Sequence, residues 1–122
     1  MKLDLDRVPR TLSESVQMIV ESLELEEIEY IKNSKSLIEC HHTVGRYFRN
    51  NWSLWDKECP LPIHFREVHK IWHADDMSGL ILYGVWCIVR NEKPDYENEI
   101  KRYHNYWKGY GLDPFTGERP NR

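Results

Sequence analysis

The sequence predicts an all-α fold, namely a compact single-domain bundle of five to six short helices around a central apolar helix at about 77–91. Apolar residues recur at helical spacing in successive segments, and prolines separate those segments. A chain of 122 residues, 40% of them hydrophobic, can bury one core without disulfides or metals. We expect one domain over residues 1–122, in which 1–10 and 112–122 are peripheral and the turn-rich tail is either surface-bound or partly mobile.

Two helices are predicted in the N-terminal third of the chain. Thr11 and Glu14 have capping-box spacing, and an apolar line at helical spacing follows them, so the first helix spans about 12–23. A short second helix, with Ser22 as a candidate cap, ends near Asn33. This part of the chain is the most acidic, because it contains Glu21, Glu24, Glu26, Glu27 and Glu29. These side chains form either a solvated face or a patch that attracts a basic partner.

The middle of the chain predicts two more helices, separated by a break at Pro60 and Pro62. The first spans about 36–51, and Gly45 inside it costs roughly 1 kcal/mol relative to alanine, which indicates close approach of another element. The second spans about 63–72, with Pro62 in its first turn. Its inward-facing side chains are expected to be Phe65, Val68 and Trp72.

The central helix is predicted from the most apolar stretch of the chain. Asp75 and Asp76 can satisfy free amides at its start, and both carboxylates favour the positive end of the helix dipole. The side chains from 77 to 91 are apolar almost all round, which places this helix at the centre. Isoleucine, valine, tyrosine and tryptophan also suit a strand over 80–89, but the caps and the length favour a helix.

A final helix is predicted at about 96–108, after the break at Pro94, with Asp95 as its cap and Gly109 and Gly111 at its end. Its aromatic side chains cannot all face one core, so we expect part of them to be exposed, as at an interface. These aromatic residues are Tyr103, Tyr106, Trp107 and Tyr110.

Composition argues against several classes of protein. The 17 basic and 20 acidic residues give a net charge of −3, which disfavours a nucleic-acid binder. The three cysteines form an odd set without a CxxC pair, as is usual for reduced thiols of the cytosol. The N-terminus lacks the apolar run of a signal peptide, and the longest apolar stretch is about half of the roughly 20 residues that span a membrane. We therefore expect a cytoplasmic protein that binds neither nucleic acid nor membrane.

The stretch 49–55, RNNWSLW, has two interpretations. In the structural one, Asn50 or Asn51 ends a helix while Trp52 and Trp55 cover the core, and every residue is explained without a ligand. In the binding one, planar donors of this region suit a carboxylate, a phosphate or an acidic loop of a partner. Those donors are Arg46, Arg49, Asn50 and Asn51.

His69 and His73 are four residues apart, so they share a face if one helix contains both. With Asp75 or Asp76 they offer two imidazoles and a carboxylate, which are metal-compatible ligands. The spacing is common by chance and no HExxH motif is present, so the simpler interpretation is that the aspartates cap a helix and the histidines lie at the surface. The cysteines lie in apolar stretches, where thiols are usually inert. We expect no metal site, no catalytic residue and no cofactor.

Two stretches, HHTVGRYFRNNWSLW and further along HADDMSGLIL, resemble a family of short uncharacterised bacterial proteins, a domain of unknown function with an RNNW…LW motif followed by an HPDDMS-like motif. The resemblance covers residues 9–107, and Ala74 stands where the family pattern has proline. It implies a shared fold and no activity. If the shared polar positions form a site, its residues here are His41, Arg49, Asn50, Asn51, Trp52, His73, Asp75 and Asp76. The simplest arrangement pairs Arg49 with Asp75 or Asp76 across two helices.

We expect a small cytoplasmic protein–protein interaction domain, most concretely an immunity or inhibitor protein that neutralises a bacterial toxin. Small size, mild acidity, surplus aromatic residues and the lack of a catalytic motif lead to this expectation. The alternative is a small ligand-binding domain or enzyme in which the Arg/Asn and His/Asp groups converge on one pocket. A homo-oligomer built through the aromatic last helix is a third interpretation.

Overall fold

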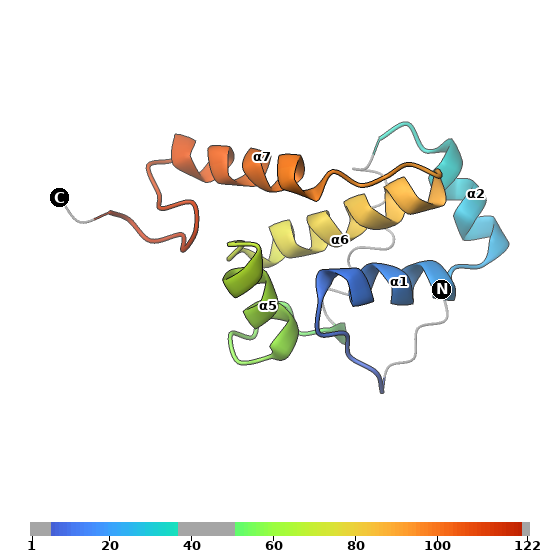
Figure 1. The fold of residues 1–122 in the computed structure, drawn as a ribbon, viewed down its shortest axis with the longest axis horizontal. Coiled ribbons are helices and arrows are strands. Elements are labelled where there is room, and N and C mark those ends of the chain that lie inside the picture. The colour runs from blue at the N-terminus through green and yellow to red at the C-terminus, as the bar shows by residue number, and fades with distance from the viewer. Residues whose placement is uncertain (1–5, 37–50, 121–122) are drawn as a thin grey trace.

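The computed structural model describes residues 6–36 and 51–120, and all regular structure within these ranges is helical (Figure 1). The helices are α1 (Leu12–Ser22), α2 (Leu25–Asn33), α5 (Pro60–Val68), α6 (Ala74–Val89) and α7 (Tyr96–Gly109). The predicted all-α class is therefore confirmed. The helix predicted at 36–51, with Gly45 inside it, lies almost entirely outside the described residues.

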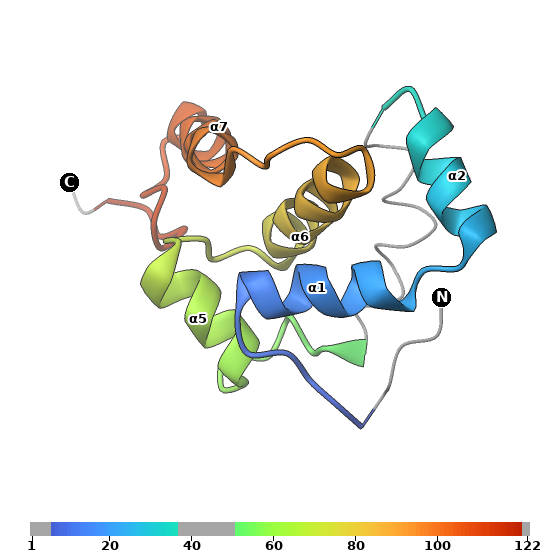
Figure 2. The ribbon, with the colours of Figure 1, turned by 45° about the vertical axis from the view of Figure 1, so that its right-hand side comes forward.

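Helix α6 is the centre of the fold, as its apolar sequence predicts. Eleven of its 16 residues are buried, and it contacts each of the other four described helices. Helices α1 and α7 lie on opposite sides of it, which two views of the molecule show (Figures 1 and 2). After Val89, Asn91 adopts a left-handed φ of 57°, and the amide of Glu92 donates to the carbonyl of Cys87 at 2.7 Å. This hydrogen bond closes the end of the helix.

Helices α1 and α6 form the main core through aliphatic side chains. Val16 and Ile19 of α1 and Leu80 of α6 are at most 1% exposed. Gly84 allows the close approach of the two helices, because a Cβ there would lie 2.7 Å from Cγ2 of Val16 and would also meet the Tyr96 hydroxyl. The cap predicted for α1 is present, since the amide of Glu14 donates to the Thr11 hydroxyl at 3.1 Å.

The start of α2 differs from the prediction. The hydroxyl of Ser22 donates to the Ile19 carbonyl at 2.7 Å and so remains part of the last turn of α1. The cap of α2 is Glu24, whose amide donates to the carboxylate of Glu27 at 3.1 Å. Glutamate thus occupies the N-cap position that serine or threonine occupies in the commoner capping box.

Helix α5 begins and ends earlier than the predicted helix at 63–72. Pro60 stands in its first turn, where a missing amide hydrogen costs nothing. The helix stops at Val68 because Lys70 adopts a left-handed φ of 58° and the amide of Ile71 donates back to the Phe65 carbonyl at 3.0 Å. Phe65 is fully buried as expected, but Val68 is 63% exposed, and Trp72 lies beyond the helix.

Helix α7 forms an outer layer on α6. The predicted cap is confirmed, because the Asp95 carboxylate accepts from the amide of Asn98 at 3.2 Å. Gly111 ends the helix with φ of 75°, and the amide of Leu112 donates to the Trp107 carbonyl. None of the residues of α7 is fully buried. The segment that follows α7 packs against the loop between α5 and α6, since a Cβ on Gly117 would lie 2.5 Å from the Trp72 ring.

Candidate functional site

The motif RNNWSLW is only partly described by the structure. His41, Arg46, Arg49 and Asn50 lie outside the described residues, so their pairing with the aspartates of α6 stays a prediction. Asn51 is exposed, whereas Trp52 is only 2% exposed and belongs to the core. The candidate binding role of Trp52 is therefore not supported, because a buried indole is occupied with packing.

The two tryptophans of this motif do not act alike. The structural interpretation holds for Trp52, but Trp55 is 59% exposed, so the expectation that it covers the core is wrong. Leu54, fully buried, fills the inner position instead. Ser53, which lies between the two tryptophans, adopts a left-handed φ of 51°. The Trp55 ring lies edge-on to His73, with ring centroids 5.9 Å apart.

His69 and His73 do not share a helix face, so the metal pair that their spacing suggests is wrong. His69 ends α5 and His73 precedes α6, with the left-handed Lys70 between them. His69 instead pairs with His64, and their Nε2 atoms are 3.1 Å apart. Burial lowers the pKa of both imidazoles, and the neighbouring His64 lowers the pKa of His69 further. Among the described residues, no three His, Cys, Asp or Glu side chains gather as a metal site needs.

His73, not an aspartate, caps the central helix. Its Nδ1 accepts from the amide of Asp75 at 3.1 Å, and its carbonyl accepts from the amides of Asp76 and Met77, both at 3.1 Å. Asp75 and Asp76 lie in the first turn, as expected, where carboxylates favour the helix dipole. The predicted capping role of the aspartates is thus corrected. The amides of Asp75, Asp76 and Met77 all donate to His73, and the Nδ1 atom acts as an acceptor.

Asp76 is held by an indole from α7. Nε1 of Trp107 donates to Oδ2 of Asp76 at 2.7 Å, and no described residue donates to Oδ1. Burial raises the pKa of Asp76, while the Trp107 hydrogen bond and the nearby His73 oppose that shift. The net direction is upward, so the protein holds this carboxylate where its charged form is disfavoured.

Aromatic rings continue from this point across the surface. We call Trp55, His73, Tyr106, Trp107 and Tyr110 the aromatic surface. Ring centroids of His73 and Trp107 lie 5.4 Å apart in a stacked arrangement, those of Tyr106 and Trp107 lie 5.0 Å apart, and those of Tyr106 and Tyr110 lie 5.1 Å apart. Tyr106 and Tyr110 are 55% and 64% exposed. The expectation of exposed aromatic residues on the last helix is confirmed.

A pocket of about 410 Å³ opens within this surface. Its lining residues are His73, Asp75, Asp76, Arg102, Tyr103, Tyr106 and Trp107. Sequence reasoning named the α6 residues as site candidates and the aromatic residues of α7 as an interface, but it did not bring the two groups together. The signal for the α7 group was present, because Tyr103, Tyr106, Trp107 and Tyr110 follow the spacing i, i+3, i+4, i+7 and so share one helix face.

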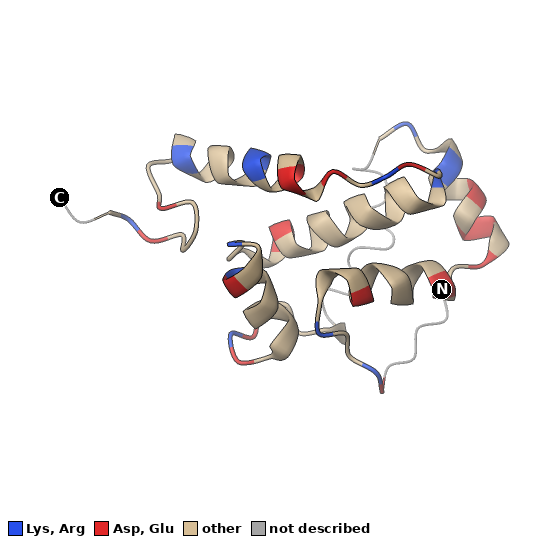
Figure 3. Ribbon diagram, viewed as in Figure 1, with Lys and Arg blue, Asp and Glu red and all other residues tan. Residues whose placement is uncertain are grey.

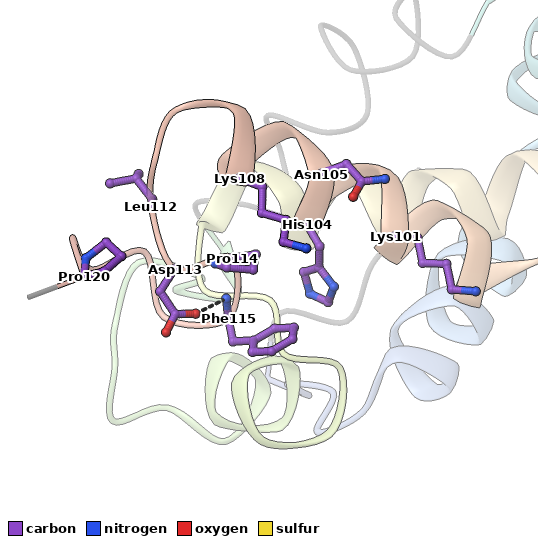
Figure 4. Close-up of a pocket in the computed structure, with 9 residues that line it drawn as sticks. All are labelled: Lys101, His104, Asn105, Lys108, Leu112, Asp113, Pro114, Phe115 and Pro120. Carbon is purple, nitrogen blue, oxygen red and sulfur yellow. Dashed lines mark hydrogen bonds between the residues drawn. The ribbon is translucent and has the colours of Figure 1, made fainter.

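A larger pocket, of about 620 Å³, lies between α7 and the tail and contains none of the predicted site residues (Figure 4). Lys101 and Lys108 line it from the helix, and the exposed Phe115 lines it from the tail. His104 packs edge-on against Phe115 and bonds to the Lys70 carbonyl at 2.8 Å, so it ties the tail and α7 to the end of α5. This imidazole has a structural task.

The described cysteines are poor nucleophiles. The thiol of Cys59 donates to the Asp56 carboxylate at 3.3 Å, and this hydrogen bond raises the pKa of Cys59. Burial raises the pKa of Cys87. A raised pKa keeps a thiol protonated at neutral pH and therefore unreactive.

None of the helices in the described ranges has the length and apolarity that crossing a membrane requires.

Residues 8–88 match a family described as a domain of unknown function, DUF6794. No curated protein and no solved structure matches the chain. The expected resemblance to a domain of unknown function is confirmed, although the match ends within α6 and not at the expected residue 107. The aspartates of α6 lie inside the matched stretch, whereas α7 and its aromatic residues lie outside it. Because the match covers well over half of its 122 residues, the chain belongs to the DUF6794 family.

Proposed function

We propose that this protein is a protein–protein interaction module that binds its partner through the aromatic surface. The observation that carries the proposal is the combination of exposure and order in these rings. Trp55, Tyr106 and Tyr110 are each more than half exposed, yet each is in ring contact with a neighbour of the same surface. Trp and Tyr are the residues that most often dominate binding energy at interfaces.

The arrangement of the rings favours tight association. A side chain that is already fixed loses little conformational entropy when a partner covers it. Trp107 is fixed by its hydrogen bond to Asp76, and His73 is fixed by its bond to the α6 amide of Asp75. The indole N–H of Trp107 and Nδ1 of His73 therefore have partners already, so a binding protein would not leave these two groups buried without a hydrogen bond.

The narrower proposal is an inhibitor or immunity protein that neutralises a bacterial toxin in the cytoplasm. It is supported by the net charge of −3 and by the acidic residues that follow one another along α2 (Figure 3). Such a patch speeds the encounter with a basic partner without adding much affinity. Glu24, Glu26 and Glu29 are exposed there.

A small ligand-binding domain or enzyme is the second candidate, and the aromatic-walled pocket is the observation that favours it. It would require the Arg/Asn and His/Asp groups to converge on that pocket. His73 and Asp76 do meet there, but each already has a structural partner, respectively the α6 amides and Trp107. We therefore rank binding of a protein ahead of catalysis.

Affinity capture from cells that express the protein tests the proposal. The wild type is compared with a Trp55→Ser, Tyr110→Ser double variant and with a control double variant, Leu25→Ser, Val68→Ser. The control positions are similarly exposed, at 72% and 63%, but lie on α2 and α5. We expect one stoichiometric partner for the wild type and the control, and its loss from the aromatic variant. Equal capture by both variants, or capture only of further copies of the chain, would contradict a separate partner on this surface.

A further inference from the structure

The pocket within the aromatic surface has walls and charges that identify what it accepts. Tyr103, Tyr106 and Trp107 line one side from α7, and His73 with the two aspartates lines the other from the start of α6. Aromatic faces attract cations through their quadrupole, whereas aspartates attract cations through their charge. Both kinds of wall therefore select the same class of group.

The positive charge of the lining is already neutralised. Arg102 is the only cationic residue among those described around the pocket, and its Nη1 lies 2.8 Å from the Glu99 carboxylate. The guanidinium that lines the pocket thus has an acidic partner outside the lining, and Asp76 remains as an acidic lining residue. A bound cation would meet no uncompensated like charge from these residues.

The start of α6 does not offer the alternative, an anion site. Helix N-termini bind anions through free amides. Here the amides of Asp75, Asp76 and Met77 all donate to His73, so these three donors are not available to a ligand. Asp75 and Asp76 also repel an anion at this end of the helix.

Asp76 and Trp107 prepare the pocket for a cation. Oδ2 of Asp76 accepts from the indole, while Oδ1 receives no hydrogen bond from the described residues and can accept from a ligand. The Trp107 ring itself is already stacked on His73 and lies 4.7 Å from the Trp72 ring, whereas Tyr106 is 55% exposed. Asp76 therefore supplies an acceptor in a pocket whose exposed aromatic ring is that of Tyr106.

We propose that this pocket binds an arginine side chain of the protein partner, stacked on the Tyr106 ring and hydrogen-bonded to Asp76. Arginine fits better than lysine because a guanidinium stacks on aromatic faces and donates in its own plane. The inference rests on the proposed function, since the arginine belongs to the bound protein. A guanidinium in the pocket would also offset the burial that disfavours the charged form of Asp76.

The test uses ethylguanidinium as the probe and its neutral planar analogue ethylurea as the comparison, at constant ionic strength. Binding is followed through the indole Nε1–H signal of Trp107 in NMR spectra, assigned by its absence from Trp107→Phe. We expect a saturable shift with ethylguanidinium and none of comparable size with ethylurea. An equal response to both probes, or no response to either, would overturn the cation pocket.

Variants locate the binding. Asp76→Asn keeps an oxygen for the Trp107 indole and removes the charge, so we expect it to weaken ethylguanidinium binding about tenfold while the protein stays folded. Tyr106→Leu removes one aromatic wall and should weaken binding about threefold. Glu97→Gln, an exposed carboxylate of α7 outside the pocket, is the charge-matched control and should change the affinity less than twofold. Equal weakening by Asp76→Asn and Glu97→Gln would show a general charge effect and contradict the assignment.

Tyr110→Leu separates this inference from the proposed function. Tyr110 belongs to the aromatic surface but does not line the pocket. Its loss should weaken capture of the protein partner at least tenfold and leave ethylguanidinium binding nearly unchanged. Partner capture without guanidinium binding would refute the pocket and leave the interaction proposal standing. Guanidinium binding without any partner would refute the interaction proposal, and the occupant would then be a small guanidinium compound instead of a protein arginine.

Discussion

The contacts that α6 makes with α1 and with α7 consist of different kinds of side chains. Towards α1, α6 presents fully buried aliphatic side chains such as Leu80 and Ile81, and Gly84 brings the helices close together. Towards α7 the contact consists of half-buried rings and a hydrogen bond to Asp76, and none of the residues of α7 is fully buried. The first contact serves stability. The second leaves rings and a carboxylate within reach of a partner, which places the functional candidates on the less protected side of α6.

The largest effect is expected from an α1–α6 core residue. Leu80→Ala removes a fully buried side chain and should lower the free energy of unfolding by about 2–5 kcal/mol. Ile100→Ala on α7 removes a partly buried side chain and should cost roughly 1–2 kcal/mol. Urea denaturation of both variants measures the difference. Equal losses of unfolding free energy in the two variants would contradict the difference between the two contacts.

Two glycines give a sharper version of the same comparison. Gly84→Ala places a methyl group against Val16 of α1 and against the hydroxyl of Tyr96, the first residue of α7, and the resulting overpacking should cost about 1–2 kcal/mol after the gain in helix propensity. Gly109→Ala, at the end of α7, meets nothing within 4 Å and should raise stability by up to about 1 kcal/mol. Thermal unfolding of the pair gives opposite signs if α6 is closely packed at Gly84 and the end of α7 is open, and the same sign if it is not.

Loss of the indole hydrogen bond should have a smaller effect. Trp107→Phe keeps most of the ring but leaves Asp76 without its donor, which should cost about 1 kcal/mol. Because that hydrogen bond lowers the pKa of Asp76, its removal should raise the pKa further. An NMR titration of the Asp76 carboxyl group measures the change. An unaltered or lower pKa in the variant would mean that the bond does not stabilise the charged carboxylate.

The smallest effect is expected from acidification. Burial lowers the pKa of His64 and His69 below the ordinary value of 6.5, so the unfolded chain binds protons more readily than the folded one. Their contribution to stability is therefore complete above pH 6.5 and is lost as the pH falls below it. Solvent screening limits the loss to less than about 1 kcal/mol for each ring. In the His64→Gln, His69→Gln variant, the free energy of unfolding should fall less between pH 7 and pH 5 than in the wild type. Urea denaturation at both pH values measures this, and an equal fall in the two proteins would contradict the role of these histidines.

Periodicity was enough to predict the helices but not the residues between them. The all-α class, the central position of α6 and the caps Thr11 and Asp95 follow from spacing and local hydrogen bonding, which act within a few residues. The end of α5 at Val68 does not, because it depends on Lys70 adopting a left-handed conformation that lysine rarely prefers. That turn also places His69 and His73 on different elements, so the helix face that their spacing would have given them does not form.

The two parts of the site, on α6 and on α7, were each predictable from the sequence, but their contact was not. His73 and Asp76 stand out in the sequence, and so does the aromatic stripe of α7, but their contact joins residues 31 positions apart. Spacing within one helix cannot reveal such a contact, because it depends on how α6 and α7 pack. The two tryptophans of RNNWSLW illustrate the same limit, because the spacing does not reveal that Trp52 is buried and Trp55 is exposed, nor that Ser53 between them is left-handed.

Photo-crosslinking in living cells tests the central claim most directly, that the α7 side of the molecule is its binding side. A photoreactive phenylalanine analogue replaces Tyr110 in one variant and Leu25 in the other, two positions that are 64% and 72% exposed. Our account predicts one discrete adduct from position 110, with a protein of different sequence that contains arginine near the crosslink, and none from position 25. The same adducts from both positions, an adduct with a second copy of the chain, or none from position 110 would contradict it.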